Sequence, residues 1–162
     1  MDGPVKKIMV YIDGTEQSIT AAKYAICLSR TMNAELTALY IINTLALTEL
    51  VKTHILVKSE EEEFQRDLEA DADRYLNHVR ELARQKGLCI NTIKTSGTVH
   101  LEIKNKILEN NIDLLALGEL SRIQSRRDEF YNDIERAMRS VPCSVLIVKD
   151  EDHVRYLFNS LI

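Results

Sequence analysis

The sequence predicts an α/β fold: a five-stranded, mostly parallel sheet with helices on both faces. Three observations support this prediction. Five short runs rich in β-branched and aliphatic residues alternate with segments whose apolar residues recur every three or four positions. Several of these runs are apolar enough to be covered on both faces, which is typical of parallel strands. Strands that alternate with helices imply right-handed crossovers, and 162 residues fit one domain.

The first half of the chain contains two predicted strands. Lys7–Ile12 is rich in β-formers and is followed by Asp13 and Gly14, which signal a turn. Thr15 is placed to cap the next helix, in which four apolar residues recur at steps of four, three and four. The second strand is predicted over Leu36–Asn43. The four apolar helix positions are Ala21, Ala25, Leu28 and Met32.

A long amphipathic helix is predicted next. Ser59 and Glu62 form a capping box, in which each side chain satisfies a free backbone donor near the helix start. Gly87 is a suitable residue to end this helix. Its apolar stripe steps by three or four residues and comprises Phe64, Leu68, Ala72, Tyr75, Val79 and Leu82.

Three further strands and two helices complete the predicted order. Strands are expected over Cys89–Thr95, Leu114–Leu117 and Ser144–Val148. One helix is expected from Thr98 to Asn110, and another is marked by apolar residues at helical spacing and ends before Pro142. Those apolar residues are Phe130, Ile134, Ala137 and Met138.

The charge balance disfavours a nucleic-acid partner. The chain has 21 Lys and Arg residues against 25 Asp and Glu residues, a net charge of −4, whereas nucleic-acid-binding domains carry a basic excess or stripe. We therefore expect no nucleic-acid partner. No window approaches 18 uncharged apolar residues, so we expect no membrane span, and the absence of a secretory signal favours a cytoplasmic location.

Cysteine and histidine spacing predicts neither a disulfide framework nor a metal site. Cys27, Cys89 and Cys143 are far apart and form no Cys-x-x-Cys pair, so they are interpreted as buried small hydrophobic residues. The four histidines have no ligand spacing. No catalytic arrangement is evident either, because the sequence has no Ser-His-Asp motif, no His-Glu-x-x-His and no P-loop lysine. We therefore expect that the protein is not an enzyme.

Three segments together resemble the universal stress protein family. They are the end of the first strand with its Asp-Gly-Thr-Glu-Gln-Ser turn (11–18), the strand that delivers a glycine (112–118), and Val-Pro-Cys-Ser followed by a short apolar strand (141–148). The resemblance covers roughly residues 5 to 149. It implies a Rossmann-like fold of the adenine nucleotide α-hydrolase-like type.

ATP-binding members of that family carry a loop written Gly-x2-Gly-x9-Gly-Ser/Thr before the last helix. Counted from Gly118, the second glycine position holds Ser121, the third holds Tyr131 and the hydroxyl position holds Asn132. Backbone N–H groups hold phosphate oxygens, and glycine lets the backbone approach them closely. Since two glycines and the hydroxyl are missing, the chain resembles a branch that does not hold ATP in that way.

Two other positions match the family's nucleotide-site pattern. Asp13 matches an aspartate that lies near the nucleotide, and Ile41 matches a position whose backbone reads adenine. The alternatives are that Asp13 caps its own turn and that Ile41 is a core residue. Gly118 is interpreted as a left-handed or tight-turn glycine rather than a phosphate contact. Tyr11 departs from the proline that is common two residues before the aspartate.

Three arginines lie in the same degenerate loop. Arg122, Arg126 and Arg127 offer guanidinium groups that can replace the lost backbone cradle and hold an anionic ligand. The alternative is a solvated basic surface offset by Asp128 and Glu129.

Two segments exceed a minimal family domain. Residues 44–58 are too apolar for a plain loop and are interpreted as a lid, a dimer surface or an extra packed element. After the domain over residues 1–149, an amphipathic tail is expected over 150–162. Its apolar residues predict that the tail docks onto its own domain or onto a dimer partner. The alternative is that the tail binds another protein. The apolar residues are Val154, Leu157, Phe158, Leu161 and Ile162.

The resemblance also implies a homodimer formed through the last strand. Ser144–Val148 is short, apolar and uncharged, so its edge needs protection. The leading hypothesis is a non-catalytic, dimeric stress-response or signalling module in the cytoplasm, without a cofactor. The alternative is a regulatory switch that binds ATP or AMP through Asp13, Ile41 and the loop from Gly118 to Asn132. An adenine-nucleotide hydrolase-type enzyme is disfavoured because the Ser-Gly-Gly pyrophosphate motif is missing.

Overall fold

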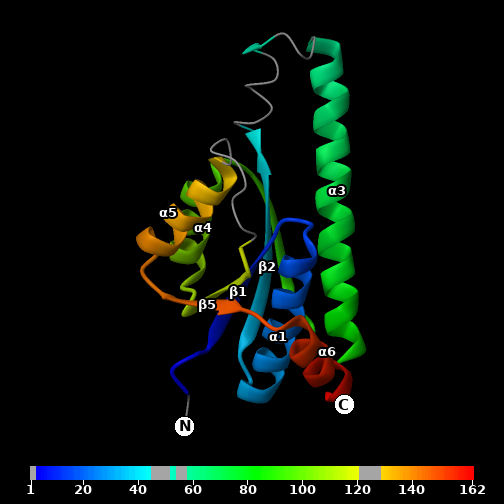
Figure 1. Ribbon diagram of the computed structural model, residues 1–162, viewed down its shortest axis with the longest axis vertical. Coiled ribbons are helices and arrows are strands. Elements are labelled where there is room, and N and C mark those ends of the chain that lie inside the picture. Colours follow the sequence, from blue (N-terminus) through cyan, green and yellow to red (C-terminus); the bar gives the residue numbers. More distant parts are fainter. Residues whose placement is uncertain (1–2, 45–51, 54–57, 121–128) are drawn as a thin grey trace.

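The computed structural model describes residues 3–44, 52–53, 58–120 and 129–162, without the side chains of 58–59 and 129–132 (Figure 1). The helices and strands of the sheet domain and tail are β1 (Lys7–Ile12), α1 (Glu16–Met32), β2 (Glu35–Asn43), α3 (Lys58–Gln85), β3 (Asn91–Gly97), α4 (Val99–Asn110), β4 (Leu114–Gly118), α5 (Glu129–Ser140), β5 (Ser144–Val148) and α6 (Glu151–Ser160).

The five strands form one parallel sheet in the order β3-β2-β1-β4-β5. The predicted fold class is therefore confirmed, and all of the strand pairs are parallel. The chain moves outward from β1 to β3 and then returns to the other side of β1 with β4. The boundary between β1 and β4 is the topological switch point, where sheets of this kind bind ligands beyond the carboxyl ends of their strands.

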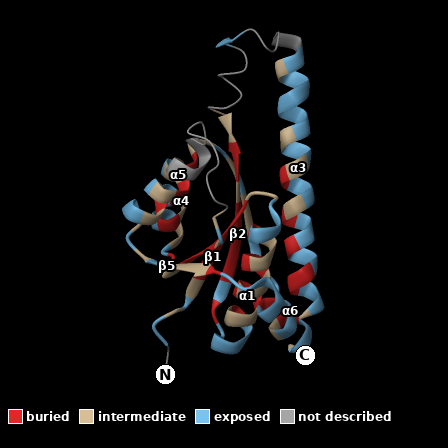
Figure 2. Ribbon diagram, viewed as in Figure 1, coloured by how far each residue is buried: buried red, intermediate tan, exposed pale blue. Residues whose placement is uncertain are grey.

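Helices cover both faces of the sheet because successive strand residues point to opposite sides. Ile8, Val10 and Ile12 of β1 belong to one buried cluster, which α1, α3 and α6 cover. Met9 and Tyr11 belong to a second cluster, which α4 and α5 cover. Figure 2 shows the buried residues concentrated on the sheet and on the sides of the helices that face it. β1, β2, β4 and β5 therefore contribute to both cores, whereas the edge strand β3 contributes only Ile93, to the second.

The long helix α3 is packed over only part of its length. Its buried residues begin at Ala72, whereas Phe64 of the same apolar stripe is 36% exposed. In Figure 1 the N-terminal end of α3 extends beyond the sheet. The predicted stripe is thus buried only where the sheet lies beneath it. α3 begins at Lys58, and the predicted capping box rests on the Ser59 side chain, which lies outside the described residues.

The third strand begins later than predicted. β3 runs from Asn91, so Cys89 lies outside the sheet and is exposed, which contradicts its interpretation as a buried residue. Cys27 and Cys143 are half-buried, and all three cysteines are free thiols. Burial raises the pKa of the Cys27 and Cys143 thiols, which keeps them protonated and unreactive.

The predicted tail forms α6 and docks onto its own domain. Val154 and Phe158 are buried in the cluster shared with α1, while Ile162 is almost fully exposed. The Lys86 ammonium lies 4.7 Å from the centre of the Phe158 ring and donates a hydrogen bond of 2.9 Å to the Leu161 carbonyl. Docking of this helix onto its own domain is the outcome that the structure shows. Within the described residues, no helix is long and apolar enough to cross a membrane.

Asp113 joins the beginnings of β1 and β4 and makes stability depend on pH. Its Oδ2 accepts hydrogen bonds from the backbone N–H groups of Lys6 (2.9 Å) and Lys7 (3.0 Å), which lower the pKa of the carboxyl group. A lowered pKa in the folded chain stabilises it above the ordinary value of about 3.9, and this stabilisation is lost as the pH falls through the folded value. We expect Asp113→Asn to be less stable than the wild type at pH 7 and to lose less stability on acidification below about pH 4.

Urea unfolding followed by circular dichroism from pH 7 to pH 2 measures this difference. The matched control is Asp67→Asn, which changes an exposed carboxylate of α3. Parallel pH profiles for the wild type and Asp113→Asn would contradict the role given to the two backbone hydrogen bonds.

Candidate functional site

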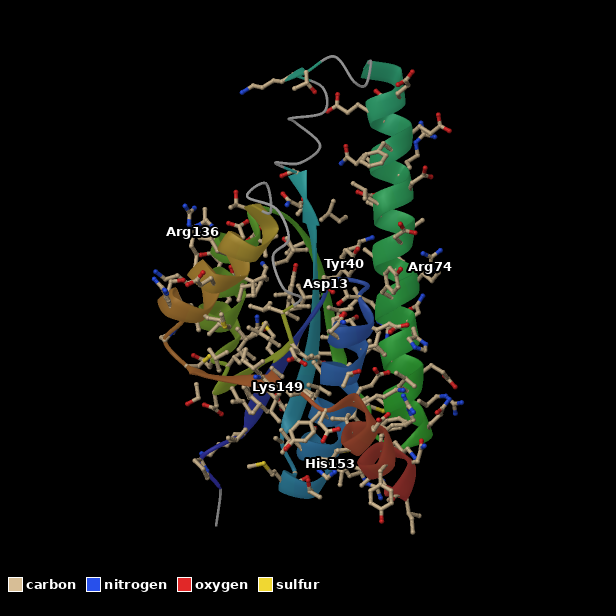
Figure 3. The ribbon with its side chains drawn as sticks, in the orientation of Figure 1. Asp13, Tyr40, Arg74, Arg136, Lys149 and His153 are labelled. Carbon is tan, nitrogen blue, oxygen red and sulfur yellow. The ribbon has the colours of Figure 1, made fainter. Side chains whose placement is uncertain are left out.

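The candidate site lies at the carboxyl ends of β1, β2 and β4. Asp13 follows β1, Asn43 ends β2 and Gly118 ends β4. All three residues therefore lie at the same edge of the sheet. Figure 3 labels Asp13 and Tyr40 side by side at this edge. The parallel arrangement of the strands brings them together, because parallel strands end at the same edge of a sheet.

Asp13 is engaged by its own turn. Its Oδ1 accepts hydrogen bonds from the backbone N–H (3.0 Å) and the hydroxyl (2.6 Å) of Thr15. Thr15 Oγ1 in turn accepts from the N–H of Ser18 (3.2 Å), which makes Thr15 the N-cap of α1, as predicted. The backbone N–H of Asp13 donates to Ser18 Oγ at 3.4 Å. These contacts fit the interpretation of Asp13 as a residue that closes the turn and starts the helix.

Gly118 has a packing role that differs from the predicted one. It is not among the glycines with positive φ, so the interpretation as a left-handed turn residue is wrong. A Cβ atom at this position would lie 2.5 Å from both the carbonyl carbon and the carbonyl oxygen of Gln17. The end of β4 therefore lies directly against the backbone of the first turn of α1. Only glycine permits this approach.

Ile41 and Tyr11 fill the α4 and α5 side of the same edge. Ile41 is 5% exposed and Tyr11 is 4% exposed, and both belong to the buried cluster on that face. The side chain of Ile41 therefore belongs to the core. Burial, followed by the nearby carboxylates of Asp13 and Asp133, raises the pKa of the Tyr11 phenol well above its ordinary value. The neutral Tyr11 ring therefore occupies a position at which a proline is common in the family that the sequence resembles.

His100 and Asp133 form a polar pair that the sequence did not reveal. His100 Nδ1 lies 2.8 Å from Asp133 Oδ1, and the two side chains are 21% and 15% exposed. The pair connects the N-terminal turns of α4 and α5. No motif links these positions, because the contact exists only once both helices pack on the same face of the sheet.

A second cluster that the sequence did not reveal lies on the opposite face of the sheet. The rings of Tyr40, from β2, and Tyr75, from α3, are nearly parallel, with centroids 6.1 Å apart and an angle of 8° between their planes. The Arg74 guanidinium lies 5.2 Å from the centre of the Tyr75 ring, and its NH2 lies 2.9 Å from Asp71 Oδ1. Gly14, with a φ of +86°, packs against the Tyr75 ring.

A pocket opens at the ends of β4 and β5, beside the N-termini of α1 and α6. It is open to solvent. The lining includes one lysine and three carboxylates, and the carboxylate of Asp150 caps α6 by accepting a hydrogen bond from the N–H of His153 (3.2 Å). This excess of acidic groups disfavours phosphate binding. The lining residues are Gln17, Thr20, Glu119, Val148, Lys149, Asp150 and Glu151.

The remaining loop predictions lie outside the described residues. They concern Ser121, Arg122, Arg126 and Arg127, and they also concern the side chains of Tyr131 and Asn132. Most of the apolar segment over 44–58 lies outside them as well. Among the described residues, no group of three or more His, Cys, Asp or Glu side chains is arranged to hold a metal ion.

Comparison with known proteins identifies the family. Residues 4–149 match the Universal stress protein family. Universal stress protein MJ0531 of Methanocaldococcus jannaschii is 26% identical over 144 residues, which cover 89% of this chain and 82% of the relative.

Solved structures share the fold. The universal stress protein UspA from Lactobacillus plantarum superposes with a TM-score of 0.71 at 19% identity, covering 90% of this chain and 98% of the other. A universal stress protein family member from Arabidopsis thaliana, solved with AMP bound, superposes with a TM-score of 0.63 at 14% identity, covering 91% of this chain and 94% of the other. Since the family match covers most of the sequence, the chain belongs to the universal stress protein family.

Proposed function

We propose that this chain is a non-catalytic, dimeric stress-response or signalling module of the cytoplasm, one that does not hold ATP through the family's glycine loop. One observation carries this proposal: the motif residues that the structure describes are used by the fold itself. The Asp13 carboxylate closes its own turn, and Gly118 packs against the backbone of α1. These contacts support a structural role for both residues in preference to phosphate binding.

The side chains around the switch point support the same proposal. The Tyr11 ring is buried between the sheet and the helices α4 and α5, beside Ile41. An adenine base that approached the backbone of Ile41 from this face would have to displace the ring. The carboxylates of Asp13 and Asp133 both act on the Tyr11 phenol, and negative groups in that position repel polyphosphate.

The second candidate function is a regulatory switch that binds an adenine nucleotide. The observation in its favour is the Arabidopsis thaliana relative that was solved with AMP bound. In that case Asp13, Ile41 and the loop from Gly118 to Asn132 would form the site, with Arg122, Arg126 and Arg127 as anion contacts.

Mass spectrometry of the purified chain, released under denaturing conditions, distinguishes the two functions. We expect no stoichiometric adenine nucleotide. We also expect ATP and AMP at millimolar concentration to leave the melting temperature unchanged, because only a ligand that binds the folded state raises it. Inorganic phosphate serves as the control for nonspecific anion effects. A stoichiometric nucleotide, or a shift with AMP but not with phosphate, would establish the switch instead.

The proposed dimer forms through the edge of β5. The two edges of the sheet differ: β3 carries Lys94, which pairs with Asp73 at 3.0 Å, whereas β5 is uncharged and its central residues are half-buried. A charged edge resists pairing with another strand, and an apolar edge favours it. Light scattering at micromolar concentration is expected to give twice the chain mass of 18.6 kDa. A mass of one chain would refute the dimer without affecting the nucleotide result.

A further inference from the structure

We propose that Tyr40 and Tyr75 are a site of oxidative modification, at which a one-electron oxidant joins the two phenol rings into dityrosine and thereby links the sheet covalently to α3. The modification requires two tyrosines whose rings are already in place, because phenoxyl radicals that diffuse apart react elsewhere. The two rings are nearly parallel at 8°, and their centroids are 6.1 Å apart.

The fold holds both rings in this position. Tyr40 is in β2 and Tyr75 is in α3, and both are half-buried against the core that these elements share with α1. Gly14 packs against the Tyr75 ring near its hydroxyl end, and Arg74 lies over the ring at 5.2 Å. These contacts limit the motion of Tyr75, so that a radical formed on one ring meets the other.

Carboxylates near Tyr40 can accept the proton that a phenol loses when it is oxidised. The carboxylates of Asp71 and Asp13 are close enough to Tyr40 to raise its pKa, after the larger effect of burial. A phenol that remains protonated next to a carboxylate transfers its proton to that acceptor as the electron leaves. Half-burial leaves part of each ring accessible to a small oxidant.

The reaction balances as follows. Each phenol loses one electron to the oxidant and one proton to a carboxylate or water, which gives two phenoxyl radicals. Their ring carbons ortho to oxygen form one C–C bond. The hydrogen on each joined carbon then moves, through solvent, to the phenol oxygen and restores both aromatic rings. The two electrons reduce two equivalents of the one-electron oxidant, and the two protons remain with the carboxylates or water that accepted them, so the protein loses two hydrogen atoms in total.

The test is photo-oxidation of the full-length chain with tris(bipyridine)ruthenium and persulfate, which accepts the two electrons. We expect a product of one-chain mass that is two hydrogens lighter and has dityrosine fluorescence. Trypsin is then expected to release peptide 31–52 joined to peptide 75–80, because these contain Tyr40 and Tyr75. The melting temperature of the linked chain should rise, since the link restricts the unfolded chain.

Variants separate this site from random coupling. Tyr40→Phe and Tyr75→Phe are each expected to abolish the linked peptide, while Tyr156→Phe, which alters a 70% exposed ring on α6, leaves it unchanged. Circular dichroism checks that the variants are folded. A tenfold dilution of the wild type provides a readout that needs no variant, because an intramolecular yield does not fall on dilution. The proposal is refuted if coupling occurs only between chains, if it persists in Tyr75→Phe, or if the folded wild type yields no peptide that joins these two residues.

Discussion

Replacing Gly118 by alanine is expected to lower the free energy of unfolding by about 2–3 kcal/mol, the cost of overpacking a well-packed site. The added methyl group would lie 2.5 Å from two backbone atoms of Gln17 and 2.9 Å from the N of Ser18. Backbone atoms at the start of α1 cannot rotate away as a flexible side chain can. The end of β4 and the first turn of α1 must therefore separate, which loosens the turn that Asp13 and Thr15 close.

Thermal unfolding followed by circular dichroism measures this effect, with an expected decrease in Tm of roughly 4–12 °C for a domain of this size. Gly3→Ala is the matched control, because no atom lies within 4 Å of a Cβ at Gly3 and its φ is not positive. We expect no measurable change for Gly3→Ala. If the two variants were equally stable, the close approach between β4 and α1 would not be the reason for glycine at position 118.

Replacing Phe158 by alanine is expected to destabilise the chain by about 3–4 kcal/mol, since large buried aromatic side chains cost this much when truncated. Phe158 is 5% exposed, and the ammonium groups of Lys23 and Lys86 lie 5.7 Å and 4.7 Å from the centre of its ring. Each cation adds about 0.5–1 kcal/mol to the hydrophobic contact. The change removes the main apolar contact that holds α6 on α1.

The control for this variant is Tyr156→Ala in the same helix. Tyr156 is 70% exposed, so its removal is expected to change stability by less than about 0.5 kcal/mol. Urea unfolding gives the free energies, and limited proteolysis reports whether the tail has become detached. Equal losses in the two variants would mean that α6 contributes through its helical structure in general and not through the buried face. A stable Phe158→Ala chain would show that docking of α6 is not needed for the fold.

Much of the fold was predictable because strand boundaries depend on local signals. β1 and β5 have the predicted bounds, since each is an apolar run between turn residues, Asp13 and Gly14 after the first and Pro142 before the second. The Thr15 cap was predictable for the same reason: its partner, Ser18, is three residues away. β3 was placed two residues too early because Cys89 and Ile90 continue its apolar pattern without being paired.

The candidate site was predictable only in its location. In a parallel sheet the element order brings the strand ends to one edge, and the structure places Asp13, Asn43 and Gly118 there. The order contains no information on which groups meet across that edge. His100 with Asp133 and Tyr40 with Tyr75 come from elements that are distant in the chain, and their contacts depend on how the helices pack.

The sequence by itself determined the alternation of strands and helices, the Thr15 cap of α1 and the family to which the chain belongs, because these follow from local residue patterns. The tertiary structure decided what Gly118 and the C-terminal tail do. A glycine signals either unusual dihedral angles or close packing, and only the position of α1 against β4 distinguishes the two. An apolar helical face must likewise be covered, and only the assembled domain identifies α1 as the surface that covers α6.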